Sequence, residues 1–186
     1  SINEVPMTVF AKGAYFVRKE MGNLNCRTIG LDWNMDPILS RELIGADKVR
    51  KVVEDATKTS IALESQDTVV CMLTMVNFDD KLISAMFEHV QEILKPGGKF
   101  IFSLYNHQAF DTRYKLYSEA GAPFVSFDRD SGLFTFEDGY KEASFSRQFT
   151  EAEVRAIVEK STLEFSYFDT QGITHIAVIE KPKVSE

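Results

Sequence analysis

The chain is constrained most by the segment from Glu92 to Ser103, where a helix gives way to an apolar strand through a Pro-Gly-Gly turn. Upstream of this junction, apolar residues recur every three or four positions from Leu82 to Leu94, which predicts a helix with one buried face. Downstream, Phe100 to Leu104 is the kind of apolar run found in strands that are covered on both faces. A helix, a tight turn and a buried strand in this order favour a parallel sheet with helices packed on it.

The preceding segments continue this alternation. Strands are predicted at Val5–Phe10, Arg27–Leu31, Val49–Val53 and Thr68–Leu73, and helices at Tyr15–Met21, at Asp36–Ile44 and from Asp79 or Asp80 to the junction. After Tyr105 the pattern changes, and short strands separated by hairpin turns are predicted at Phe124–Phe127, Leu133–Phe136 and Ala143–Phe145. Thr150 and Glu153 form a capping box that opens a helix to about Lys160. A final strand pair is predicted at Glu164–Phe168 and Thr174–Ile179.

The composition and charge limit the classes of protein to which this chain can belong. The chain has 186 residues, of which 44% are hydrophobic, which fits one domain over residues 1–186 with a β-rich insertion at about 114–149. A net charge of −7 gives no indication of nucleic-acid binding, and no apolar run is long enough for a membrane span. Two distant cysteines favour a reduced, cytoplasmic protein, and three scattered histidines give no metal site.

Several of these segments resemble class I S-adenosylmethionine (SAM) dependent methyltransferases. The resemblance is carried by the Pro-Gly-Gly junction, by Asp32 and Asp55 after two predicted strands, and by the segment Asp67–Phe78. It covers roughly Val5 to Lys181. It implies a Rossmann-like, mostly parallel α/β sheet with helices on both faces, an antiparallel last strand and a small antiparallel β insertion after strand five.

The resemblance implies SAM as cofactor and assigns the adenosine half of its site. Asp32 would accept hydrogen bonds from both ribose hydroxyls, and Trp33 would cover the adenine ring. Asp55 would accept from the adenine amino group, while the backbone amide of Ala56 donates to a ring nitrogen. The structural alternatives are a helix N-cap for Asp32 and a solvated loop position for Asp55.

Around the reacting methyl group, the resemblance places Cys71 and Met72 near the cofactor sulfonium and Asn77 at the mouth of the substrate site. Cys71 has no basic partner nearby in sequence, so we expect a buried cysteine and not a nucleophile. Substrate-binding residues of the family often follow the fifth strand, which here points to Tyr105, Asn106 and His107. His107 is a candidate general base, and its alternative is an exposed loop histidine.

The resemblance is weakest in the segment that would hold the methionine half of the cofactor. Gly13 lies about 19 residues before Asp32 and matches the last glycine of the family's first motif. Ala11, Val9 and Met7 stand where two glycines and an acidic residue are expected. Three explanations remain open: the motif is degenerate, another loop holds the cofactor, or the sequence lacks residues before Gly13.

The leading functional prediction is a methyltransferase that acts on a small-molecule or protein substrate, with catalytic residues unassigned. The first alternative is a catalytically inactive, methyltransferase-like subunit that binds a partner protein, which the degraded glycine motif favours. The second is another nucleotide-binding α/β domain, such as a fragment of a dinucleotide-dependent dehydrogenase. The antiparallel ending and the Pro-Gly-Gly junction argue against that last interpretation.

Overall fold

The computed structural model describes residues 5–11, 26–31, 49–52, 56–137 and 145–183; the predicted helices at Tyr15–Met21 and Asp36–Ile44 lie outside these ranges. The strands are β1 (Val5–Ala11), β2 (Cys26–Leu31), β3 (Val49–Val52), β4 (Gln66–Met72), β5 (Leu94–Tyr105), β6 (Phe124–Asp128), β7 (Leu133–Phe136), β8 (Phe145–Arg147), β9 (Glu164–Gln171) and β10 (Thr174–Glu180). The helices are α3 (Asp80–Ile93), α4 (Phe110–Glu119) and α5 (Glu151–Glu159), with 3-10 turns η1 (Met75–Asn77) and η2 (His107–Ala109).

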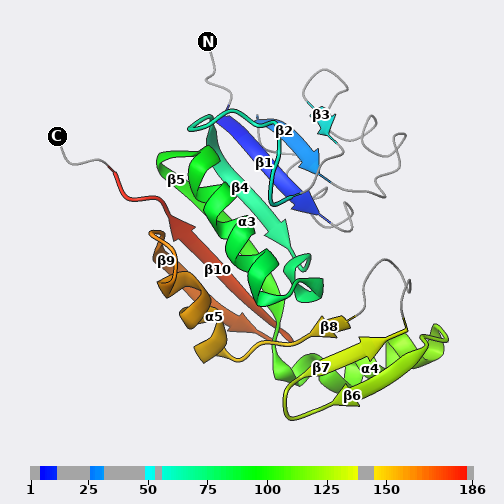
Figure 1. Cartoon of the computed structure of the whole chain (residues 1–186). Helices are drawn as coiled ribbons and strands as arrows, with labels where there is room; N and C mark the ends of the chain where they lie inside the picture. Colours follow the sequence, from blue (N-terminus) through cyan, green and yellow to red (C-terminus); the bar gives the residue numbers. More distant parts are fainter. Residues whose placement is uncertain (1–4, 12–25, 32–48, 53–55, 138–144, 184–186) are drawn as a thin grey trace.

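Among the described residues, seven strands form one sheet in the order β3-β2-β1-β4-β5-β10-β9. The pairs among β1 to β5 are parallel, whereas β10 runs antiparallel to both β5 and β9. Helices α3 and α5 lie side by side on one face of this sheet (Figure 1). The predicted Rossmann-like α/β fold with an antiparallel last strand is therefore confirmed.

The core between α3 and β5 follows from the apolar stripe of the helix. Asp79 is the N-cap of α3, because its carboxylate accepts a hydrogen bond of 2.7 Å from the backbone amide of Leu82. Phe87 on α3 packs edge-to-face on Phe100 and Phe102 of β5, with ring centroids 5.4 and 5.6 Å apart. All three rings are buried, so the predicted helix face is the one that covers the sheet.

The Pro-Gly-Gly junction differs in one respect from the predicted turn. The helix ends at Ile93, and the chain enters β5 directly at Leu94, so that the two glycines lie within the strand. Gly97 has a φ of +75°, a conformation that glycine adopts without a steric penalty. Its amide donates to the carbonyl of Lys181 at 2.8 Å, and the Lys181 amide donates to the carbonyl of Gly98 at 2.9 Å. The junction thus bends the strand and also holds the chain beyond β10.

Replacing Gly98 by alanine is expected to destabilise the fold by about 2 kcal/mol, because the added methyl group overpacks a rigid site. A Cβ at Gly98 would lie 2.8 Å from the carbonyl oxygen of Lys95 and 3.1 Å from that of Gln66. Urea unfolding measures the change. The control is Gly121→Ala, where φ is +68° but no atom lies within 4 Å, so only a conformational cost of about 1 kcal/mol is expected. Equal losses at both positions would show that contact with the backbone carbonyls is not the cause.

The segment after β5 forms a small second layer. Strands β6, β7 and β8 make an antiparallel sheet in that order, which confirms the predicted meander; of the predicted third strand, Phe145 lies in β8, and residues 143–144 lie outside the described residues. The sequence prediction contained no helix before this sheet, but α4 packs across one of its faces. Phe110 of α4 stacks on Phe134 of β7 with centroids 4.6 Å apart. The insertion therefore has a small aromatic core of its own.

Candidate functional site

The order of the strands places a topological switch point between β1 and β4. From β1 the chain continues to β2 on one side, whereas β4 leads to β5 on the other. The two strands end together, since Ala11, the last residue of β1, is paired with Met72, the last residue of β4. In open α/β sheets, ligands bind outside the carboxyl ends of the strands at such a point. This edge of the sheet is the candidate site.

The backbone turns sharply where β4 ends. Leu73 has a φ of +54°, a left-handed conformation that is unfavourable for a leucine. Its amide donates to the carbonyl of Ser103 in β5 at 3.1 Å, which ties the turn to the neighbouring strand. The chain then forms η1, where Met75 is buried and Asn77 is half-buried. The strained turn directs the segment that contains Asn77 past the end of the sheet.

Cys71 is buried in β4 and is not available as a nucleophile. The side chain has no exposed surface, and burial raises the pKa of its thiol to about 12, against weaker lowering by hydrogen bonds with Thr74 and the Met75 backbone. A thiol that keeps its proton is unreactive. Met72, the next residue, is half-buried at the strand end. The pair can shape the end of β4 but supplies no acid or base.

Cys71 is expected to react with iodoacetamide at pH 8 at least about 100-fold more slowly in the folded protein than in urea, because little thiolate forms at the buried site. Peptide mapping by mass spectrometry would follow this residue separately from Cys26. In the unfolded chain the thiol has the ordinary cysteine pKa of 9.0, whereas burial in the fold raises that pKa to about 12. Folding stability should therefore fall as the pH rises from 9.0 towards 12. Similar labelling rates in both states would contradict the buried position.

Most of the residues predicted to hold the adenosine half lie just beyond the described strands. Asp32 and Trp33 follow Leu31, the last residue of β2, and Gly13 follows β1, but all three lie outside the described residues. Asp55 is also outside them. Ala56, the next residue, is described: it is half-buried and packs against the main core. The structure therefore describes only the end of this segment.

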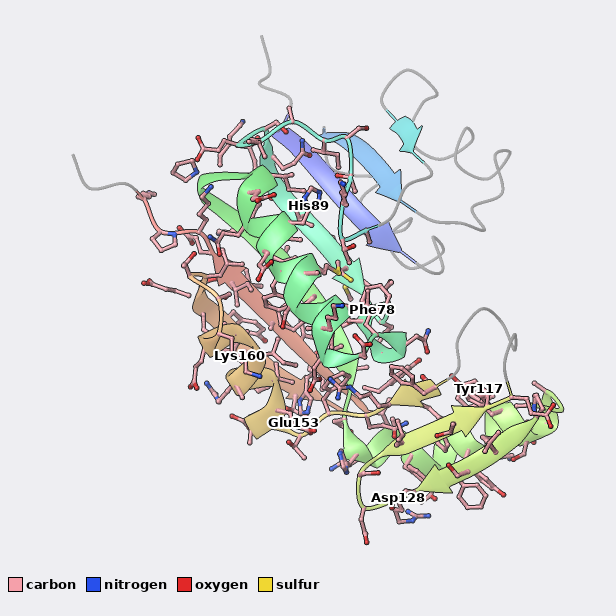
Figure 2. All side chains as sticks on the ribbon, viewed as in Figure 1. Phe78, His89, Tyr117, Asp128, Glu153 and Lys160 are labelled. Carbon is pink, nitrogen blue, oxygen red and sulfur yellow. The ribbon has the colours of Figure 1, made fainter. Side chains whose placement is uncertain are left out.

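The loop that returns from Ala56 to β4 is anchored by a residue that the sequence analysis did not single out. His89 of α3 is buried, and its Nε2 accepts a hydrogen bond of 3.1 Å from the Thr59 amide. The Thr59 hydroxyl lies 2.7 Å from the same nitrogen. Figure 2 shows His89 and Phe78 at opposite ends of α3, so this histidine lies away from the carboxyl edge of the sheet. His89 thus positions the loop and is not a candidate for chemistry.

The three residues after strand five are held tightly where β5 meets the insertion. Asn106 is buried; its Nδ2 donates to the Gly172 carbonyl at 2.8 Å, and its Oδ1 accepts from the Gln108 amide at 2.9 Å. The Nε2 of His107 is buried with no hydrogen-bond partner among the described residues. It lies close to the β6–β7 turn, since a Cβ at Gly132 would be 3.0 Å from it. Asn106 is therefore occupied within the fold, whereas His107 has a nitrogen that no described residue uses.

Tyr105 is half-buried, and one face of its ring is covered by Arg113 of α4. The guanidinium carbon lies 4.3 Å from the ring centroid, which is a cation–π contact. Arg113 is itself buried, donates to the Arg147 carbonyl at 3.1 Å and to the Tyr117 hydroxyl at 3.0 Å, and its pKa is lowered by burial. Arg113 was not predicted as a site residue because it lies on α4, the helix that was not predicted from sequence. Arg113 fixes the position of Tyr105 and joins α4 to β8.

The part of the chain that the structure describes offers neither a metal site nor a membrane-spanning helix. No group of three or more His, Cys, Asp and Glu side chains there could hold a metal ion. None of the helices described is long and apolar enough to cross a membrane.

Comparison with solved structures places the fold among methyltransferases. A SAM-dependent methyltransferase from Methanosarcina mazei superposes with a TM-score of 0.72 at 18% identity, covering 97% of this chain and 94% of that chain. A 1,6-didemethyltoxoflavin-N1-methyltransferase from Burkholderia thailandensis, solved with bound 1,6-didemethyltoxoflavin and S-adenosylhomocysteine, gives 0.69 at 12% identity, with 97% and 72% covered. A putative methyltransferase of Haloferax volcanii, solved with the Trm112 methyltransferase activator, gives 0.67 at 17% identity, with 100% and 86% covered.

The sequence also matches a family of known proteins. The family is described as a methyltransferase domain, and the match spans residues 10–102, which is half of the 186-residue chain. This range includes the switch point, the strained turn at Leu73 and the Pro-Gly-Gly junction. The chain therefore belongs to the methyltransferase domain family.

Proposed function

We propose that the protein transfers a methyl group from SAM to a small-molecule or protein acceptor. The observation that carries this proposal is the switch point between β1 and β4, followed directly by the strained turn at Leu73. Open α/β sheets bind ligands at such a point, and this chain belongs to a methyltransferase family. The S-adenosylhomocysteine bound to the Burkholderia neighbour supports the same class of cofactor.

The proposed cofactor residues divide along this edge. Asp32 and Trp33 would hold the ribose and cover the adenine, and Asp55 with the amide of Ala56 would recognise the adenine edge. A carboxylate suits the ribose because its two oxygens can accept from both hydroxyls at once. Gly13 would allow the backbone to approach the methionine moiety. Ala56, which packs half-buried against the core, is the described end of this proposed adenine segment.

The reacting end would lie over β4 and β5. When bound, SAM supplies an electrophilic methyl group on a sulfonium. Cys71 and Met72 would form the wall beside that group, and Asn77 and Tyr105 would orient the acceptor. Direct displacement requires alignment more than acid–base catalysis, so a neutral, buried Cys71 is compatible with it. His107, whose Nε2 has no partner among the described residues, is the proposed base for an acceptor that must lose a proton, and Asn106 would position it.

A second proposal is a catalytically inactive subunit that binds a partner protein. Two observations favour it: Val9 and Ala11 stand where the family's first motif has close-approach residues, and the Haloferax neighbour was solved with an activator protein. Such a subunit would keep the fold without binding SAM.

Calorimetric titration of the folded protein with SAM separates the two proposals. The enzyme proposal expects saturable binding with a micromolar dissociation constant and one site per chain. An intact fold, shown by a cooperative urea transition, together with no heat of binding would reject the enzyme in favour of the subunit. Titration with S-adenosylhomocysteine in parallel controls for breakdown of SAM.

A further inference from the structure

One ring nitrogen of His107 is buried and unused. Its Nε2 has no hydrogen-bond partner among the described residues. The other two histidines of the chain are satisfied: the Nε2 of His89 accepts a backbone hydrogen bond, and the ring nitrogens of His175 lie 2.8 Å from the Thr170 hydroxyl and 3.0 Å from the Phe149 carbonyl. A buried nitrogen without a partner is unfavourable, because it has lost its hydrogen bonds to water. Within the described part of the chain, the fold therefore covers the Nε2 of His107 without compensating it.

The turn between β6 and β7, at residues 129–132, lies over this nitrogen. A Cβ at Gly132 would be 3.0 Å from the Nε2 of His107, so a glycine is needed for the turn to approach the ring this closely. Gly132 also has a φ of +66°, which glycine adopts without a steric penalty. Its carbonyl accepts a hydrogen bond of 2.9 Å from the amide of Gln148, the residue that follows β8. The turn is thus closed on His107 and is attached to the end of β8 through its last residue.

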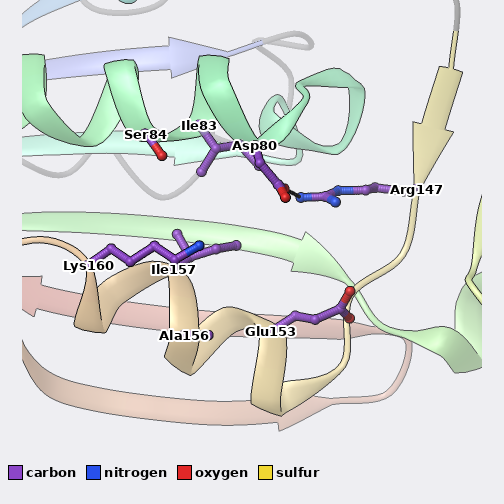
Figure 3. A pocket seen from close by; sticks show the side chains of 8 residues that line it. All are labelled: Asp80, Ile83, Ser84, Arg147, Glu153, Ala156, Ile157 and Lys160. Atoms are coloured by element: carbon purple, nitrogen blue, oxygen red, sulfur yellow. Dashed lines mark hydrogen bonds and ion pairs between the residues drawn. The ribbon is translucent and has the colours of Figure 1, made fainter.

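Strand β8, on the other side of His107, is fixed to three neighbouring elements. Arg147 pairs with Asp80 of α3 at 2.6 Å, as Figure 3 shows. The buried Arg113 of α4 donates to the carbonyl of Arg147 at 3.1 Å. Phe149 is buried as well, and its amide donates to the carbonyl of Tyr105 in β5 at 2.8 Å. The β6–β7 turn therefore closes against a strand that α3, α4 and β5 hold in place.

The β6–β7 turn itself is held on α4 by exposed contacts. Arg129 forms a two-fold ion pair with Asp111, in which one hydrogen bond is 2.9 Å long, and these side chains are 64% and 70% exposed. The guanidinium also lies 5.0 Å from the centroid of the Phe110 ring. Within the turn, the Asp128 carboxylate accepts from the Asp130 amide at 3.0 Å, so the turn is a compact unit. Because water and salt weaken exposed ion pairs, this attachment is much weaker than that of β8.

We propose that the β6–β7 turn is a gate over His107 and that the Arg129–Asp111 pair holds this gate closed. Opening breaks the ion pair and the hydrogen bond between Gln148 and Gly132, while β8 stays in place. The Nε2 of His107 then becomes available to a methyl acceptor that must lose a proton, and closure shields it from water. The base role of His107 in this inference rests on the proposed function, whereas the opening of the turn does not depend on SAM.

The test measures how fast diethyl pyrocarbonate acylates each histidine of the full chain at pH 8, where imidazole is neutral, with mass spectrometry to separate the sites. In the folded wild type, His107 should react at least about tenfold more slowly than in urea, because only the open state reacts. Asp111→Asn should raise the rate at His107 about threefold, as loss of one exposed ion pair predicts. Gly132→Ala should raise it about tenfold, because the added Cβ forces the turn away from the ring.

Each variant has a matched control. Glu119→Gln removes another exposed carboxylate of α4, which pairs with Lys115 and not with the turn, and it should leave the rate at His107 unchanged. Gly121→Ala introduces a methyl group at a similar φ of +68°, but no atom lies within 4 Å, so it should also have no effect there. The other two histidines are internal references, because their rates should stay the same in every variant.

Hydrogen exchange of the Gln148 amide reports the opening of the turn independently of any chemical reagent. This amide donates to the Gly132 carbonyl, so it should exchange about threefold faster in Asp111→Asn. The Phe149 amide, which donates to the Tyr105 carbonyl on the fixed side, should keep its wild-type rate.

Three outcomes would overturn the inference: a rate at His107 in the folded wild type equal to that in urea, equal effects of Asp111→Asn and Glu119→Gln, or parallel increases at all three histidines, which would indicate general loosening. A cooperative urea transition for each variant excludes unfolding as the cause of a faster reaction. Absence of SAM binding with a protected His107 would reject the proposed function alone and leave the turn as a gate over a buried histidine. Normal SAM binding with an unprotected His107 would reject the gate alone.

Discussion

Replacement of Phe100 by alanine is expected to lower the free energy of unfolding by about 4 kcal/mol. Phe100 has no exposed surface and lies in the middle of β5, with its ring centroid 5.4 Å from that of Phe87 and 5.2 Å from that of Phe102. Truncation removes the buried ring and leaves a cavity between α3 and the sheet, which the surrounding strands can fill only in part. Urea unfolding monitored by circular dichroism measures the loss.

Phe127→Ala is the matched control, because the Phe127 side chain on β6 is 53% exposed. Its removal should cost less than about 1 kcal/mol, as surface substitutions usually do. If both variants lose a similar free energy of unfolding, burial of Phe100 in the core does not contribute the stability that its packing implies.

Replacement of Asp32 by alanine is expected to raise the dissociation constant for SAM about 100-fold. The carboxylate is proposed to accept from both ribose hydroxyls, and two hydrogen bonds to a charged group are worth about 3 kcal/mol or more together. Asp32 directly follows β2 in the sequence, and Leu31, the last residue of β2, is paired with Phe10 of β1, the strand that borders the switch point. Isothermal titration calorimetry measures the change.

Two further variants sharpen this test. Asp32→Asn keeps the shape of the side chain and one acceptor oxygen, so a smaller loss of about tenfold is expected. Asp111→Ala removes an exposed carboxylate that pairs with Arg129 in the insertion, and it should leave SAM affinity unchanged. Wild-type affinity in Asp32→Ala would reject the ribose role of this residue and leave its structural alternative, the N-cap of a helix.

The main sheet could be predicted from sequence because its strands are continuous apolar runs whose character does not depend on distant contacts. Thr68–Leu73 and Phe100–Leu104 are examples: they end within one residue of the observed β4 and β5, although these strands begin earlier, at Gln66 and Leu94. The capping box at Thr150 and Glu153 could also be predicted from sequence, and both of its hydrogen bonds are present. Local chemistry specified these elements, whereas the antiparallel direction of the last strand was implied by the family resemblance.

Helix α4 was missed although the sequence contained a signal for it. Phe110, Tyr114 and Tyr117 are spaced four and three residues apart, which is a helical stripe, and the first and last of them pack on Phe134. The surrounding phenylalanines at alternate positions favoured a β-rich interpretation of the whole stretch. In the structure, the helical spacing belongs to α4 and the alternating phenylalanines belong to the β6–β8 sheet. These are the two layers of one small core.

The roles of Asn106 and His107 could not be decided from sequence, because they depend on residues far along the chain. Asn106 is fixed by the carbonyl of Gly172, 66 residues away, and His107 lies against the turn at Gly132. Their position after a strand end suggested substrate binding for both. The difference arises from the packing of the β9–β10 hairpin and of the insertion on β5. The polar atoms of Asn106 are occupied within the fold, whereas the Nε2 of His107 has no partner among the described residues.

The most direct test of the central claim is to titrate the uniformly ¹⁵N-labelled protein with SAM and record backbone amide spectra. Binding at the switch point predicts the largest shifts at Ala56, beside the proposed adenine pocket, and at Leu73 and Thr74, where β4 ends. Amides of the insertion turn at Asp130 and Ser131 should change little. No shifts, or shifts confined to the insertion, would contradict a cofactor site at the carboxyl edge of β1 and β4.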